Sequence, residues 1–331
     1  MSGKAEQVPK AAGRLSAYDI VRLCVPTLVT LAALALHEVL PNIYPEGYES
    51  HAYPAALIAL LCLWIVLDLV SIPSRKLRAV MIKDSWLFGA LVCFFALWDW
   101  ATLKTGMLEL PLMTSPDAVF EVLVNENTAM LLYLGQSCQL LFIGLFFGAL
   151  FGLISGLLMG WFKAVDYWMS PIVWIFGPMP GAVMLPIVVL IMPNSYSTAA
   201  CIVALAMWFA LTFNLAEAVK NVDKRVIEAA RVTGAGTPRV IFHVVLPMCL
   251  PSIFSGLFMG TCFSFTSLLT AEMLSASGGL GGYMVWSKSN VQFADIYAAM
   301  LVVIVFFFLV LEILTRVQAY MLRWKENPVE W

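Results

Sequence analysis

The sequence predicts an all-α, polytopic membrane protein with about eight transmembrane helices. Its 331 residues are 61% hydrophobic and only 12% charged, and their mean hydropathy is +0.88. Soluble domains carry about 25% charged residues, so this chain has too little polar surface to cover a water-soluble globule. The apolar residues also gather in long runs, and the basic residues fall between these runs in a regular order.

A helix needs about 20 apolar residues to cross about 30 Å of hydrocarbon. Runs of this kind lie near residues 23–40, 55–73, 85–102, 130–160, 172–192, 197–219, 248–274 and 294–320. The stretch before the first run is polar, and no small-residue cleavage site follows that run. We therefore expect the first run to be a retained span rather than a secretory signal.

Lysine and arginine concentrate in cytoplasmic loops. With a cytoplasmic N-terminus and eight spans, 17 of the 19 basic residues fall on the inner side, and only Lys104 and Lys288 fall outside. One span more or fewer in the middle would destroy this division, so the distribution itself favours eight spans. We expect both termini in the cytoplasm. The net charge of −2 gives no indication of nucleic-acid binding.

Two of the runs are unusual as helices. The fourth carries a glycine at every fourth position, which lets another helix approach closely: Gly144, Gly148, Gly152, Gly156 and Gly160. We favour packing inside one subunit for this ladder over a seam between two subunits.

The fifth run contains several prolines, so it must be kinked or broken: Pro171, Pro178, Pro180, Pro186 and Pro193. Interrupted helices in a bilayer are tolerated where they are buried or line a cavity. Lining of a pathway and simple shaping of the fold both remain open for this run.

The chain has no visible catalytic constellation. It contains no phosphate-binding loop, its three histidines lie far apart in the sequence, and its cysteines are isolated. We therefore expect no metal and no cofactor in this chain, and energy must come from a partner or an ion gradient. The main intramembrane charges are Asp99 and Glu272. Both lie near the expected outer ends of their spans, where we expect water within reach.

The most informative segment is the expected cytoplasmic loop between the sixth and seventh runs. A short helix over 224–233 would carry a polar stripe of Lys224, Glu228 and Arg231 and a mostly apolar stripe of Val226, Ala229, Ala230 and Thr233.

Gly234-Ala235-Gly236 would end that helix, and Thr237-Pro238 would begin a second one as N-cap and first-turn proline. The pattern predicts two short helices outside the membrane, whose small alanines let another protein come close. An amphipathic segment resting on lipid headgroups is the alternative.

This loop resembles the EAA loop of permease subunits of binding-protein-dependent ABC importers. The resemblance rests on Glu228-Ala229-Ala230, Gly234 and Leu246-Pro247 in the family's spacing. Weaker similarity to the nitrate, sulfonate, taurine and bicarbonate branch lies in Trp98-Asp99-Trp100, in Pro178-Met179-Pro180 with Pro186, and in Ala271-Glu272-Met273-Leu274 with Gly278-Gly279-Leu280-Gly281. It covers about residues 85–331, so residues 1–84 would be an N-terminal extension with two spans.

The resemblance implies a type I ABC importer transmembrane core in a bacterial inner membrane. Its loop at about 221–247 would dock on the ATPase through Glu228, Ala229, Ala230 and Gly234 and end at Pro247. Two separate ATPase subunits would bind ATP and magnesium and carry out hydrolysis, so this chain itself is expected to be non-catalytic. A second permease copy, a periplasmic or lipid-anchored binding protein and membrane lipid are the other implied partners.

The resemblance also implies a translocation pathway lined by the fourth to eighth spans. Its candidate lining and gate residues are Pro178, Pro180, Pro186, Glu272, Gly279 and Gly281. The implied substrate is a small oxyanion such as nitrate, a sulfonate, taurine or bicarbonate, and a vitamin precursor is the alternative. A secondary transporter would need more buried ionisable residues, and a membrane-embedded enzyme or scaffold would need a His, Cys or Asp cluster at one membrane face.

Overall fold

We analysed a computed structural model, which describes residues 17–43, 51–71, 74–108, 111–177, 179, 181–275 and 278–323. Every regular element within these ranges is a helix, as the sequence predicts. The chain forms two compact units, Met1–Asn125 and Glu126–Trp331. The boundary expected from the sequence at 84/85 falls inside one helix of the first unit, whereas the break in packing follows Asn125.

The described residues of the N-terminal unit form four helices and one π-helical turn. These are α1 (Ala17–Val39), α2 (Ala52–Ser71), α3 (Arg75–Asp99), η1 (Trp100–Lys104) and α4 (Pro116–Asn125). Helix α1 packs against α2 and α3. The buried core between them contains Ala33, Tyr53, Leu57 and Val92. Three of the unit's helical segments are long and apolar enough to span a membrane.

Polar side chains join the helix ends of this unit. The Asp99 carboxylate is only 1% exposed and lies 3.0 Å from His37 Nδ1. Lys104 Nζ donates to the carbonyls of His37 and Leu40 at the end of α1, each at 2.6 Å. The expectation that water reaches Asp99 is therefore wrong, because His37 from a distant part of the sequence covers it.

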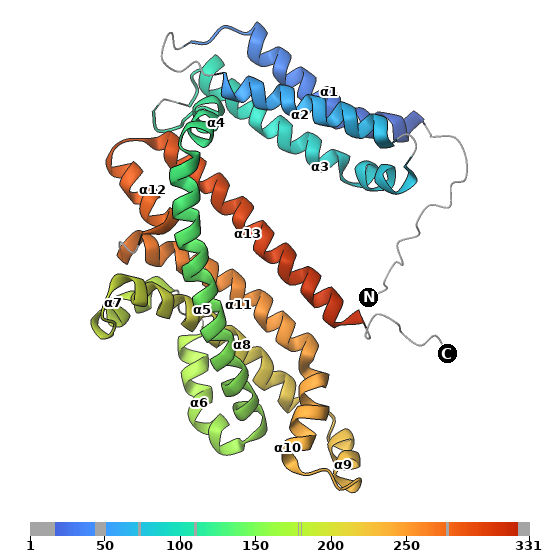
Figure 1. Cartoon of the computed structure of the whole chain (residues 1–331), viewed down its shortest axis with the longest axis vertical. Coiled ribbons are helices and arrows are strands. Elements are labelled where there is room, and N and C mark those ends of the chain that lie inside the picture. Colours follow the sequence, from blue (N-terminus) through green and yellow to red (C-terminus); the bar gives the residue numbers. More distant parts are fainter. Residues whose placement is uncertain are drawn as a thin grey trace. The chain divides into compact units, whose positions relative to one another are not determined.

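The C-terminal unit contains the remaining elements (Figure 1). They are α5 (Asn127–Trp161), α6 (Lys163–Phe176), α7 (Gly181–Ile191), α8 (Ser195–Lys220), α9 (Lys224–Val232), α10 (Thr237–Val240), η2 (Ile241–Val245), α11 (Leu246–Ser275), α12 (Gly279–Ser289) and α13 (Phe293–Met321). Helix α8 is the most buried of the long helices, because α5 and α11 both pack along it.

The glycine ladder of α5 faces α8. A Cβ at Gly144 would meet Val203, and one at Gly160 would meet Val219. Residue numbers rise together along the two helices, so α5 and α8 run parallel. The expectation that the ladder packs within one subunit is confirmed.

Helices α6 and α7 return the chain along α8. Lys220 Nζ donates to Asp166 Oδ1 at 2.6 Å near one end, and a Cβ at Gly181 would lie 3.0 Å from Ile202 near the other. Helix α6 therefore runs antiparallel to α8 between these points, and α7 follows at a bend of 114°. The described residues hold seven helices that could cross a membrane, and up to eight when this pair counts as one span.

The run predicted at 172–192 is thus two helices, not one. Pro171 lies inside α6 and Pro186 inside α7, while Pro178 and Pro180 lie outside the described residues. Helix α12 occupies most of the segment between the runs predicted near 248–274 and 294–320, where no helix was predicted.

The close contact of the α5 glycines with α8 predicts that adding a methyl group to one of them lowers the stability of the protein. Gly148→Ala places a Cβ 2.6 Å from Met207 Cβ, against the backbone of α8, whereas Gly135 on the same helix has no atom within 4 Å. We expect Gly148→Ala to cost about 1–3 kcal/mol and Gly135→Ala to be neutral or slightly stabilising. Thermal unfolding of both purified variants measures this difference. Equal melting temperatures would contradict the close α5–α8 contact.

Candidate functional site

Helix α9 is bounded at both ends by local hydrogen bonds. Asp223 caps its N-terminus by accepting from Arg225 N at 2.9 Å. At the other end Gly234 N donates to Arg231 O at 2.9 Å, and Ala235 N donates to Ala230 O at 3.3 Å. This pair of bonds is a Schellman motif. Gly234 has φ +82° and open space around a would-be Cβ, so its backbone angle, not crowding, favours glycine.

The two faces of α9 differ in what they contact. Ile227 and Ala230 pack against the core cluster at the ends of α8 and α11. Glu228 and Ala229 are exposed, and Val232 is 88% exposed. The structure therefore divides the two alanines predicted to share a stripe: Ala230 attaches the helix and Ala229 faces outward.

The second short helix runs directly into a membrane span. It begins at Thr237 and carries Pro238 in its first turn, as predicted, but its N-cap is Gly236 and not the predicted Thr237. It continues through η2 into α11. Thr237–Leu274 thus forms one apolar helical run of 38 residues. Pro247 has no amide to donate four residues back, and the π-helical turn Ile241–Val245 lies at this point. The sequence analysis expected the second short helix to lie outside the membrane, separate from the span near 248–274, and did not predict this continuity.

Glu272 lies near the C-terminal end of α11, away from the loop, and binds the start of α12. Figure 1 shows α12 at this end of α11. Its carboxylate is 1% exposed. It accepts from Ser137 Oγ at 2.7 Å and from Gly281 N at 2.9 Å, while Leu280 N donates to Ser137 Oγ at 2.9 Å. The first-turn amides of a helix have no partner within it, so Glu272 and Ser137 cap α12.

Glycine is needed where this cap is tightest. Gly279 has φ +77°, and a Cβ there would lie 2.7 Å from Ser137 Oγ. A Cβ at Gly281 would lie 2.8 Å from Glu272 Cβ. The predicted residues Glu272, Gly279 and Gly281 are therefore brought together. They form a buried junction of α5, α11 and α12, and the expectation that water reaches Glu272 is wrong.

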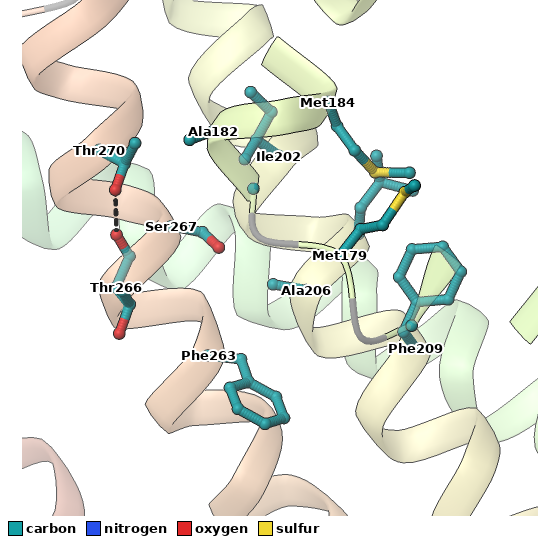
Figure 2. A pocket seen from close by; sticks show the side chains of 13 residues that line it. Met179, Ala182, Met184, Ile202, Ala206, Phe209, Phe263, Thr266, Ser267 and Thr270 are labelled. Carbon is teal, nitrogen blue, oxygen red and sulfur yellow. Dashed lines mark hydrogen bonds between the residues drawn. The ribbon is translucent and has the colours of Figure 1, made fainter. Parts of the chain in front are cut away.

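A cavity of about 370 Å³ lies where the α6–α7 break meets α8 and α11 (Figure 2). Its lining residues include the methionines and phenylalanines Met179, Met184, Phe209 and Phe263 and the hydroxyl residues Thr266, Ser267 and Thr270. Sequence reasoning did not single out the hydroxyl residues. Their signal was helical spacing, because Thr266 and Thr270 lie one turn apart on one face of a predicted span.

A second cavity of about 590 Å³ lies between the end of α8 and the start of α11. Its polar lining includes Asn214, Glu217, Asn221, Asp223, Ser252 and Ser255. It adjoins the N-cap of α9, so α8 and α11 line a cavity near each end of their contact. In the part of the chain that the structure describes, no three His, Cys, Asp or Glu side chains gather as a metal site.

Known proteins match this sequence. Residues 148–326, more than half of the chain, match the family described as binding-protein-dependent transport system inner membrane component. The taurine transport system permease protein of Escherichia coli is 27% identical over 255 residues, covering 72% of this chain and 92% of that protein. A putative aliphatic sulfonates transport permease protein of the same organism is 31% identical over 102 residues, covering 31% of this chain and 39% of that protein.

The nitrate import permease protein of Synechococcus elongatus is 23% identical over 177 residues, covering 54% of this chain and 59% of that protein. These similarities agree with the helical core, the α9–α10 loop and the resemblance first read from Glu228-Ala229-Ala230. The chain belongs to the family of binding-protein-dependent transport system inner membrane components and is a membrane-spanning permease subunit of an ABC importer.

Proposed function

We propose that this permease imports a small solute bearing an oxyanion group and is driven by ATPase subunits that dock on the α9–α10 loop. The observation that carries the proposal is the form of the loop: a capped helix whose outer face exposes Glu228, Ala229 and Val232. Exposed apolar side chains on a short helix outside the span are typical of a contact surface. Glu228, Ala229 and Gly234 would face the ATPase, and Ala230 would support them from behind.

The α9–α10 loop is connected to the membrane helices in two places, so a displacement of the loop would be transmitted to them. Helix α9 attaches through Ile227 and Ala230 to the cluster around Leu215 and Val245, and α10 continues into α11. A displacement of the loop would therefore move α11 as one body. Helix α11 contributes to the lining of both cavities, so its rotation would reshape the space along α8. ATP and magnesium would be held by the partner ATPases, two copies for a permease dimer.

The relatives' names, which specify taurine, aliphatic sulfonates and nitrate, support this substrate class. A soluble or lipid-anchored binding protein would deliver it to the outer face. The junction of Glu272 with Gly279 and Gly281 would be part of the outer gate, and Pro186 would shape the broken helix beside the pathway. In this orientation both termini lie in the cytoplasm, as the basic residues indicate.

Gly234→Asp tests the coupling role of the loop. The substitution puts a side chain at φ +82° and destroys the turn that ends α9. We expect ATP-driven uptake to be lost while the permease remains in the membrane. Gly236→Ala is the matched control, because Gly236 has φ −69° and its nearest contact would be Pro238 at 4.0 Å. Full uptake by Gly234→Asp would overturn the assignment.

Val232→Lys tests whether the outer face of α9 meets the ATPase. Val232 is 88% exposed, so the fold should be unaffected. An interface charge without a partner should weaken ATPase copurification by about tenfold or more. Val124→Lys, at another exposed valine outside the loop, should copurify normally. Unchanged association of Val232→Lys would place the docking surface elsewhere.

Glu272→Ala tests the gate. It leaves Gly281 N and Ser137 Oγ without their buried acceptor, which costs about 1–3 kcal/mol for each unsatisfied group. We expect a lower melting temperature and ATP-independent leak of taurine from loaded proteoliposomes. Glu312→Ala is the control, because Glu312 pairs with Arg316 on an exposed helix face. A destabilised Glu272→Ala protein without leak would leave the junction a purely structural cap.

A further inference from the structure

The cavity at the α6–α7 break has the dimensions of an organic ligand. Its volume of about 370 Å³ falls at the lower end of small-molecule sites, which span about 300–1,000 Å³. Met179 lies between α6 and α7 and Met184 lies on α7. Phe209 comes from α8 and Phe263 from α11 (Figure 2). An inorganic ion such as nitrate has no apolar surface to place against these walls.

One polar side chain in this cavity has no partner. Ser267 is 6% exposed and lines the cavity, and its hydroxyl projects from α11 into the space between α11 and α8 (Figure 2). No described group forms a hydrogen bond with it, whereas Thr266 donates to Cys262 O at 3.2 Å and Thr270 to Thr266 O at 2.9 Å. The Ser267 side chain lines the cavity, so a ligand group there would find a hydroxyl that no described residue already binds.

The Ser267 hydroxyl lies beside the beginning of α7. A Cβ at Gly181, the first residue of α7, would lie 2.7 Å from Ser267 Oγ. The first-turn amides of an 11-residue helix such as α7 have no acceptor within it and carry partial positive charge. No charged side chain is among the described lining residues. The place beside Ser267 therefore suits a single anionic head group, and the opposite walls suit an apolar body.

We propose that this cavity is a transient binding site for an organic anion, an apolar body carrying one oxyanion head such as an aliphatic sulfonate, and not for an inorganic oxyanion. The head would accept from Ser267 and the first amides of α7, and the body would lie against the methionines and phenylalanines. This inference rests on the proposed import function and narrows its substrate class.

The test measures ligand binding to the full-length permease in lipid nanodiscs by isothermal titration calorimetry. The probes are butane-1-sulfonate, sodium nitrate and butan-1-ol. The first has both an anionic head and an apolar body, nitrate is an oxyanion without an apolar body, and butan-1-ol has the apolar body without the anion. We expect butane-1-sulfonate to bind at least tenfold more tightly than either of the others. Ser267→Ala should weaken its binding by about tenfold, the effect of losing a hydrogen bond to a charged group.

A cavity-filling variant keeps the test independent of Ser267. Ala206 lines the cavity, so Ala206→Phe should abolish butane-1-sulfonate binding. Ile304→Phe, on an exposed face of α13, is the matched control and should bind normally. Nitrate binding as tight as the sulfonate's, or sulfonate binding retained by Ala206→Phe, would overturn the proposal.

The oligomeric state of Ala206→Phe gives a further check. Loss of a permease dimer in that variant would identify the cavity as a contact between subunits and would also overturn the proposal. ATP-driven uptake that depends on Gly234, without sulfonate binding here, would overturn this inference and leave the proposed function intact. Butane-1-sulfonate binding as expected, together with full uptake by Gly234→Asp, would overturn the proposed coupling role of the loop and leave this inference intact.

Discussion

The close parallel contact of α5 with α8 is the constraint on which the C-terminal unit depends. Lipid provides little hydrophobic drive between apolar helices, so close van der Waals contact must supply the association. Five glycines let the α5 backbone reach α8. Because the two helices run parallel, the chain has to return between them, and α6 and α7 make that return. The break in this return segment creates the cavity, so the ladder and the cavity are linked by topology.

Helix α11 connects the two ends of this unit. One end is continuous with the loop at α10, and the other holds Glu272 against α12. The loop end has an exposed face and local caps, whereas the Glu272 end is buried and joined by hydrogen bonds to α5. A rigid element with one exposed end and one held end converts a displacement at the first into a change of contacts at the second.

Local features could be predicted from the sequence, and distant pairings could not. The spans follow from composition, the glycine ladder from its spacing, and the turn at Gly234 from residue type. Glu272 and Asp99 were placed near water because a single sequence does not say which distant residue will cover them. Their partners Ser137 and His37 lie 135 and 62 residues away. Helix α12 was missed because its glycines indicate turns as strongly as a helix start.

Lys104 and Lys288 are the two basic residues that fall outside in the proposed orientation, and both lie near helix ends. Lys104 donates to the carbonyls of His37 and Leu40 at the end of α1 and to Asn42 Oδ1. Lys288 lies in the last turn of α12, where the carbonyl end of a helix attracts positive charge. Each of these cations therefore lies at the negative end of a helix. In the proposed orientation both residues serve as local dipole partners rather than as determinants of insertion, and the topological signal of the remaining 17 basic residues is cleaner than the raw count suggests.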